Sequence, residues 1–157
     1  MKTADLVDDY ADHLGLIQIP FRKFGQRAHC AGPIETLSCF EDNSLLKATV
    51  STPGSGRILV VDGGGSTRTA LVGDMIAEIA RKNGWAGIII NGAIRDSVDI
   101  DAMDFIVFAL GTTPLKSAKE NIGIIGQPIS MGGLQIQSGQ WLYADADGVL
   151  VSDQKLI

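Results

Sequence analysis

Two short segments of the chain carry charged side chains at a spacing that could serve a reaction. Asp74 follows Gly73, and after twenty further residues the chain continues with Arg95 and Asp96. An arginine guanidinium can bind a carboxylate through two parallel hydrogen bonds. An aspartate can hold a hard divalent cation that keeps several of its waters. These groups together could hold a small carboxylic acid beside a metal ion.

Gly73 indicates where a helix begins. A glycine inside a helix costs about 1 kcal/mol relative to alanine, so a helix that begins again at Asp74 explains the residue better than an unbroken one. The backbone amides near Met75 and Ile76 would then be free to bind an anion such as a carboxylate. A glycine that serves only close helix packing is the alternative.

The Arg95-Asp96 pair follows an apolar run over residues 87–90 that is typical of a buried strand. Ligands of open α/β sheets bind just beyond the carboxyl ends of the strands, so this pair has the position of a binding site. An exposed ion pair of little energetic weight is the alternative, and the dipeptide alone does not exclude it.

The elements that must position these residues alternate between strand and helix. Continuous apolar runs predict buried strands over residues 58–61, 87–90 and 105–110. The pattern between the first two strands predicts a helix over residues 66–83, interrupted at Gly73. Strand, helix and strand over about 33 residues form a βαβ unit with parallel strands.

Shorter elements flank this unit. We expect a helix over residues 3–14 that Thr3 caps, and short strands over 28–31 and 34–40. Further short elements are expected over residues 45–50 and 97–103. The C-terminal third alternates apolar and polar residues, and Asp147-Gly148 favours a hairpin. The chain is therefore expected to be a single α/β domain, residues 1–157, with a mixed, layered sheet.

Three other motifs give weaker signals. The glycine run over residues 63–65 matches neither a dinucleotide fingerprint nor a phosphate loop, and it lacks the later glycine of a methyltransferase loop. A tight turn and a binding loop both remain open for it. His29-Cys30 has no second spaced pair to complete a metal site. The acidic segment at residues 145–148 fits a hairpin better than a calcium loop.

Composition excludes several classes of protein. The chain has 157 residues, of which 45% are hydrophobic and 20% charged, and this balance excludes disorder. No apolar run approaches the roughly 20 residues of a membrane span, and no secretory signal is visible, so we expect a cytoplasmic protein. The net charge of −5 and the lack of a basic stripe argue against direct nucleic-acid binding. Two cysteines make no disulfide framework.

The spacing of Asp74 and Arg95-Asp96, with GGGSTRTALVGD before it, resembles the class II pyruvate aldolases that act on 4-hydroxy-4-methyl-2-oxoglutarate. The chain also resembles their relatives, named regulator of ribonuclease activity A. The similarity extends over nearly the whole chain, including ETLSCFEDN, ILVVDGGGSTRTALVGD and WLYADADGVLVS. The spaced motif is specific to this family, whereas the glycine run alone is not.

The resemblance implies how a substrate would be held. Backbone amides around Gly73, Asp74, Met75 and Ile76 would bind the pyruvyl part of a 2-oxo acid. Arg95 would bind the carboxylate of that acid. No covalent lysine and no reactive cysteine or histidine is required.

The resemblance also implies a cofactor and an assembly. Asp96 would ligate Mg²⁺ or Mn²⁺, and Asp74 would position a metal-bound water for proton transfer. The family fold is a swivelling β/β/α (phosphohistidine-domain-like) architecture assembled as a homotrimer. Longer aldolases of the family take a further acidic residue from a neighbouring subunit's C-terminal segment. This chain, which ends at Ile157, is expected to lack that residue, so the proton donor stays open.

Two functions follow from the resemblance. The first is a metal-dependent lyase that cleaves 4-hydroxy-4-methyl-2-oxoglutarate to pyruvate and decarboxylates oxaloacetate through a metal-stabilised pyruvate enolate. The second is a non-catalytic regulator that binds and inhibits ribonuclease E. The regulatory branch, as the family is understood, does not keep the Arg-Asp pair. Arg95 and Asp96 therefore favour the enzyme.

Overall fold

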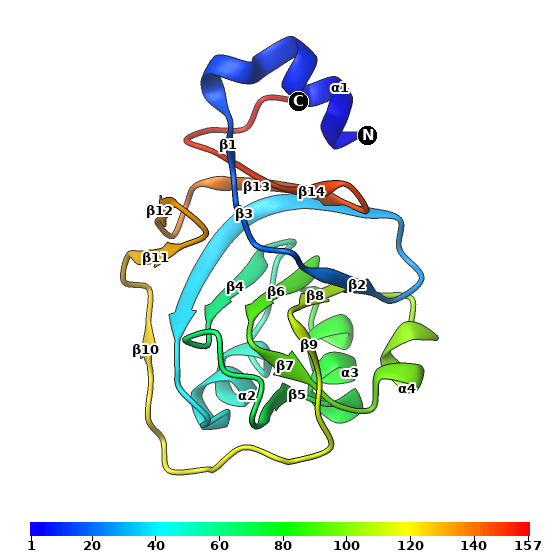
Figure 1. Ribbon diagram of the computed structural model, residues 1–157, viewed down its shortest axis with the longest axis vertical. Helices are drawn as coiled ribbons and strands as arrows, with labels where there is room; N and C mark the ends of the chain where they lie inside the picture. Colours follow the sequence, from blue (N-terminus) through cyan, green and yellow to red (C-terminus); the bar gives the residue numbers. More distant parts are fainter.

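The computed structural model describes residues 1–157 as a curled, mixed sheet with helices against one side and the N-terminal helix at the opposite end of the molecule (Figure 1). The helices are α1 (Thr3–Tyr10), η1 (a 3-10 turn, Ala11–His13), α2 (Ser44–Val50), α3 (Asp74–Lys82) and α4 (Ser97–Asp101). The strands are β1 (Gly15–Leu16), β2 (Arg22–Phe24), β3 (His29–Ser38), β4 (Ile58–Asp62), β5 (Ala70–Val72), β6 (Gly87–Asn91), β7 (Ala93–Ile94), β8 (Val107–Ala109), β9 (Gly111–Thr112), β10 (Ile124–Ile125), β11 (Ile129–Met131), β12 (Leu134–Ile136), β13 (Trp141–Asp145) and β14 (Gly148–Ser152).

Four parallel strands form the centre of the main sheet, in the order β3-β4-β6-β8. The first four residues of β4 are fully buried because both faces of the strand are covered. Ile58 and Val60 belong to one hydrophobic cluster, and Leu59 and Val61 belong to another. The predicted βαβ unit with parallel strands is thereby confirmed, with α3 as its crossover helix.

β3 joins the β13–β14 hairpin to the parallel strands because it changes its pairing partner along its length. Residues 29–33 pair antiparallel with β13, and residues 34–38 pair parallel with β4. The two short strands expected over residues 28–31 and 34–40 are therefore one strand of ten residues. Pro33, which has no N–H to donate, lies where the strand passes from one partner to the next.

The two clusters define three layers. α2, α3 and α4 cover one face of the parallel strands, as Figure 1 shows. The β13–β14 hairpin and the β11–β12 pair contribute to the cluster on the other face. The arrangement is a mixed α/β fold of the β/β/α kind, as predicted.

A second, smaller parallel sheet has the order β5-β7-β9. β7 continues β6 after Gly92, and β9 continues β8 after Leu110, whose amide donates to the Gly92 carbonyl at 2.8 Å. The expected helix over residues 66–83 is wrong in its first part. Residues 70–72 are all buried and pair with β7, so strand pairing overrides the helical pattern there.

The glycine run after β4 is a tight turn, one of the two structures the sequence allowed. Gly64 and Gly65 have φ values of 68° and 75°, which favour glycine. The Asp62 carboxylate accepts a hydrogen bond from the Gly64 amide at 2.9 Å. The ring of Phe40 lies over Gly64, so a side chain there would meet it.

The N-terminal helix is shorter than expected and is held differently. α1 ends at Tyr10, and its N-cap is Lys2, which makes no side-chain capping bond. Thr3 is therefore not the cap; its hydroxyl donates to the Asp145 carboxylate at 2.6 Å. Asp145 ends β13 opposite Gly148, which confirms the predicted hairpin. None of the helices is long and apolar enough to cross a membrane.

Candidate active site

Neighbouring strands of the small sheet bring the two predicted segments together. β5 and β7 run parallel with Val72 opposite Ile94, and the Arg95 amide donates to the Val72 carbonyl at 2.9 Å. A helix begins directly after each strand, α3 at Asp74 and α4 just after Asp96. The predicted start at Asp74 is confirmed. Segments about twenty residues apart in sequence are thus adjacent in space.

Gly73 is required by the close approach of these segments. A Cβ atom at Gly73 would lie 2.8 Å from Oδ2 of Asp96 and 3.3 Å from Nε of Arg95. The φ of Gly73 is −114°, which any residue can adopt, so the backbone conformation does not demand glycine. Glycine chosen for helix packing is also excluded, since the nearest atoms belong to Arg95 and Asp96.

Asp96 is held in an uncommon backbone conformation. Its φ of 53° and ψ of 40° lie in the left-handed region, which aspartate tolerates better than most residues. Its Oδ2 accepts a hydrogen bond from the Asp74 amide at 3.2 Å and lies 3.9 Å from Nε of Arg95. The side chains of Arg95 and Asp96 are 43% and 37% exposed, so this long ion pair leaves both groups open to a ligand.

The first turn of α3 is partly occupied by the protein's own carboxylates. The Asp74 amide donates to Asp96, and the Met75 amide donates to Oδ1 of Asp74 at 2.8 Å. Only the Ile76 amide donates to no protein group. The expectation of free amides at both Met75 and Ile76 therefore holds for Ile76 alone. A ligand that binds the Met75 amide must displace the Asp74 carboxylate.

A cavity of about 300 Å³ opens at this junction. Its walls include all six residues singled out in the sequence: Gly73, Asp74, Met75, Ile76, Arg95 and Asp96. The cavity is also lined by four residues that no motif in the sequence singles out: Asn43, Lys47, Lys116 and Lys119. Lys116 and Lys119 lie in the segment between β9 and β10, where apolar residues do not recur at a regular spacing. Only the folded chain brings these lysines to the cavity.

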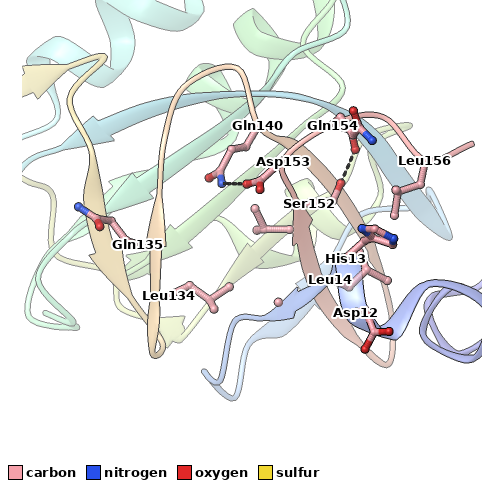
Figure 2. Close-up of a pocket in the computed structure, with 12 residues that line it drawn as sticks. Asp12, His13, Leu14, Leu134, Gln135, Gln140, Ser152, Asp153, Gln154 and Leu156 are labelled. Carbon is pink, nitrogen blue, oxygen red and sulfur yellow. Dashed lines mark hydrogen bonds between the residues drawn. The ribbon is translucent and has the colours of Figure 1, made fainter.

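A larger cavity, about 530 Å³, lies at the other end of the molecule between η1 and the C-terminal segment (Figure 2). Some of its polar side chains are already engaged in hydrogen bonds within the cavity wall. Gln140 donates to Asp153 at 2.9 Å, and the Ser152 hydroxyl donates to the Gln154 carbonyl at 2.6 Å. No arginine or lysine lines it, so it offers no clamp for a carboxylate.

The oxygen donors at the smaller cavity fit a hard divalent cation. Asp74 and Asp96 are its only carboxylates, and Mg²⁺ characteristically uses one or two carboxylates with waters and substrate oxygens. Nowhere do three His, Cys, Asp or Glu side chains gather as a metal site, which disfavours structural zinc. Beside His29, burial raises the pKa of the Cys30 thiol to about 12, which favours the neutral thiol over a reactive thiolate.

Comparison with known proteins gives a consistent result over the whole chain. The family model described as RraA-like, Aldolase/RraA, matches residues 3–151. A protein of Alkalilimnicola ehrlichii, provisionally named 4-hydroxy-4-methyl-2-oxoglutarate aldolase, is 48% identical over 157 residues, 100% of this chain and 98% of its own length. A protein of Cupriavidus taiwanensis with the same provisional name is 47% identical over 159 residues, 98% of this chain and 96% of its own.

Solved structures agree with this fold. A Geobacillus kaustophilus protein described as S-adenosylmethionine: 2-dimethylmenaquinone methyltransferase has a TM-score of 0.97 and 47% identity, over 99% of this chain and 97% of that one. The RNA-processing inhibitor RraA from Thermus thermophilis has a TM-score of 0.95 and 39% identity, over 100% and 95%. By family model, sequence and fold, the chain belongs to the RraA-like family of aldolases and RraA proteins.

Proposed function

We propose that the chain is a divalent-metal-dependent lyase that cleaves 4-hydroxy-4-methyl-2-oxoglutarate to pyruvate and decarboxylates oxaloacetate. The observation that carries the proposal is the junction of the α3 and α4 starts. There a guanidinium, an open backbone amide and two carboxylates line one cavity of about 300 Å³. The provisional names of the bacterial relatives support the same chemistry.

Each residue has a defined part in this proposal. Arg95 binds the carboxylate next to the keto group, because its planar fork matches a carboxylate in two parallel hydrogen bonds. The Ile76 amide, at the positive end of α3, holds an oxygen of the same 2-oxo acid. Asp74 releases the Met75 amide to the substrate, and its freed carboxylate then orients a water for proton transfer.

Asp96 would hold the cation, with Asp74 acting through water. When bound, a divalent cation supplies positive charge beside the oxygen on which negative charge develops as the carbon–carbon bond breaks. Both the aldol cleavage and the decarboxylation develop this charge, so one site can serve both reactions. No histidine or cysteine lines the cavity, so proton transfer falls to carboxylate and water.

The Asp96→Asn variant tests the metal site. It keeps the shape of the side chain and removes its charge, so we expect turnover to fall about a hundredfold and Mn²⁺ binding to weaken about tenfold or more. Turnover is followed by pyruvate release, and Mn²⁺ binding by electron paramagnetic resonance. Unchanged Mn²⁺ binding in a folded variant would refute the ligand role of Asp96.

A second candidate function is regulation of ribonuclease E. The solved RNA-processing inhibitor RraA, at 39% identity and a TM-score of 0.95, supports it. The presence of both Arg95 and Asp96 favours the enzyme. Pull-down of purified ribonuclease E at low salt, with an RNA cleavage assay, separates the two candidates. Binding that slows RNA cleavage, together with no lyase turnover, would place regulation first.

A further inference from the structure

The cavity at the α3 start has a charge opposite to that of the chain. The whole chain has a formal charge of −5. Four cationic side chains line the cavity, those of Lys47, Lys116, Lys119 and Arg95, against the two carboxylates of Asp74 and Asp96. Arg95 is assigned to the first carboxylate of the substrate. The three lysines have no part in the proposed reaction, so their gathering needs another explanation.

Backbone contacts hold two of these lysines in place. The connection between β9 and β10 (yellow in Figure 1) passes both β5 and α2. The Ala70 amide donates to the Leu115 carbonyl at 2.7 Å, and the buried hydroxyl of Ser117 donates to the Ala70 carbonyl at 2.8 Å. The Ala118 carbonyl accepts from the Asn43 amide at 3.2 Å. The backbone that carries Lys116 and Lys119 is therefore held in place by these hydrogen bonds.

Asn43 links Lys47, the third lysine, to the segment between β9 and β10. Asn43 lies just before α2, and its carbonyl accepts the Lys47 amide at 3.0 Å, so the two residues are one helical turn apart. Its buried side chain accepts a bond from Nζ of Lys119 at 3.3 Å and donates to the Leu71 carbonyl at 3.1 Å. Lys119 is thus oriented by a neutral partner that leaves its charge uncompensated.

No carboxylate neutralises these lysines. None of the three has a carboxylate oxygen within 4.0 Å, although Arg27, Arg57, Arg68 and Arg81 all have one. Like charges that line one small cavity repel each other, and an anion between them removes that repulsion. The lysines therefore favour an anionic ligand group beyond the one that Arg95 binds.

We propose that Lys47, Lys116 and Lys119 form a second anion subsite that holds the distal carboxylate of a dicarboxylic 2-oxo acid. This inference rests on the proposed function, in which Arg95 and the α3 amides hold the end that carries the keto group. A ligand with a carboxylate at each end spans the cavity from Arg95 to the lysines. The subsite selects dicarboxylic over monocarboxylic 2-oxo acids.

Two unreactive probes separate the subsites without any turnover. Pyruvate has only the 2-oxo acid end, whereas 2-oxoglutarate adds a distal carboxylate and is neither a β-keto acid nor an aldol. Calorimetric titration in the presence of Mg²⁺ gives the Kd of each probe. We expect the wild-type protein to bind 2-oxoglutarate about tenfold or more tightly than pyruvate.

The variants are Lys47→Gln, Lys116→Gln and Lys119→Gln, with Lys155→Gln as the control. Lys155 lies over the Trp141 ring in the C-terminal segment and does not line this cavity. Each cavity variant should weaken 2-oxoglutarate binding about three- to tenfold and leave the Kd of pyruvate unchanged. Lys155→Gln should change neither value.

Two results would overturn the inference: equal weakening of both probes, or no change in 2-oxoglutarate binding in any cavity variant. A parallel assay of pyruvate release keeps the proposed function separate. Selective loss of 2-oxoglutarate binding without turnover in the wild type would support the subsite and refute the lyase. Pyruvate release by the wild type, together with cavity variants that weaken both probes equally, would support the lyase and refute the subsite.

Discussion

At the scale of single residues, the site depends on a contact that only glycine permits. The carboxylate of Asp96 and the guanidinium of Arg95 lie over the Cα of Gly73, where a Cβ would meet them at 2.8 and 3.3 Å. The left-handed backbone of Asp96 belongs to the same junction. A strained conformation that persists beside a cavity is consistent with a functional position.

Gly73→Ala tests this contact. The added methyl group should push Asp96 and Arg95 out of place and lower turnover about a hundredfold, since small misplacements in a site are costly. Stability should change by less than about 1 kcal/mol, because alanine adopts the backbone of Gly73. Pyruvate release and urea unfolding give the two values.

Gly111→Ala is the matched control for this variant. Gly111 lies in β9 of the same small sheet, its φ is not positive, and a Cβ there would meet nothing within 4 Å. Its turnover should equal that of the wild type. An active Gly73→Ala protein would show that the close approach is not needed for the reaction.

The residues of the site could be predicted from the sequence only in part. The spacing between Asp74 and Arg95-Asp96 is visible in one chain because a βαβ unit fixes the distance between the strand ends. Lys116 and Lys119 could not be selected, because they reach the cavity through long-range contacts of an irregular connection with β5 and α2. Such contacts cannot be predicted from residue type or from spacing along the chain.

At the scale of elements, the main error concerned residues 66–73. Their apolar positions fit a helix, yet residues 70–72 form a strand buried on every side. Residues Leu45–Val50, left undefined by their pattern, belong to helix α2. Short segments of this kind take their structure from their neighbours in space, and periodicity over a few residues does not reveal those neighbours.

The attachment of α1 gives a prediction with a pH dependence. Partial burial raises the pKa of Asp145, but hydrogen bonds from the hydroxyl and amide of Thr3, at 2.6 and 2.7 Å, and from backbone amides outweigh it and lower that pKa. A lowered pKa in the folded state means that the ionised carboxylate stabilises the fold. This stabilisation is complete above the unfolded-state pKa of about 3.9 and is lost as pH falls through the lower folded-state value.

Asp145→Asn should therefore lower the free energy of unfolding at pH 7 by about 1–2 kcal/mol. It should also remove part of the acid dependence that the wild type shows below about pH 4. Urea unfolding from pH 7 to pH 2.5 measures both effects, and hydrogen exchange reports whether α1 opens first. If the free energy of unfolding fell equally in the two proteins below about pH 4, protonation of Asp145 would not contribute to the acid dependence.

At the scale of the whole molecule, the hydrophobic clusters that stabilise the fold and the candidate site lie in different places. β3 connects the hairpin layer to the parallel strands, and the two hydrophobic clusters lie on opposite faces of those strands. The candidate site lies beyond the carboxyl ends of β5 and β7, where side chains are exposed rather than packed. The layered α/β fold was predictable because continuous apolar strands demand cover on both faces. The change of partner within β3 was not, because pairing leaves no mark on composition.

In the function proposed here, the junction at Arg95 catalyses the release of pyruvate. The most direct measurement is pyruvate release from 4-hydroxy-4-methyl-2-oxoglutarate and from oxaloacetate, with Mg²⁺ and with EDTA, for the wild type and Arg95→Ala. We predict turnover that requires the metal and falls about a hundredfold or more in a folded Arg95→Ala protein. Equal release by the two proteins, or release that EDTA does not reduce, would show that this junction is not a metal-dependent lyase site.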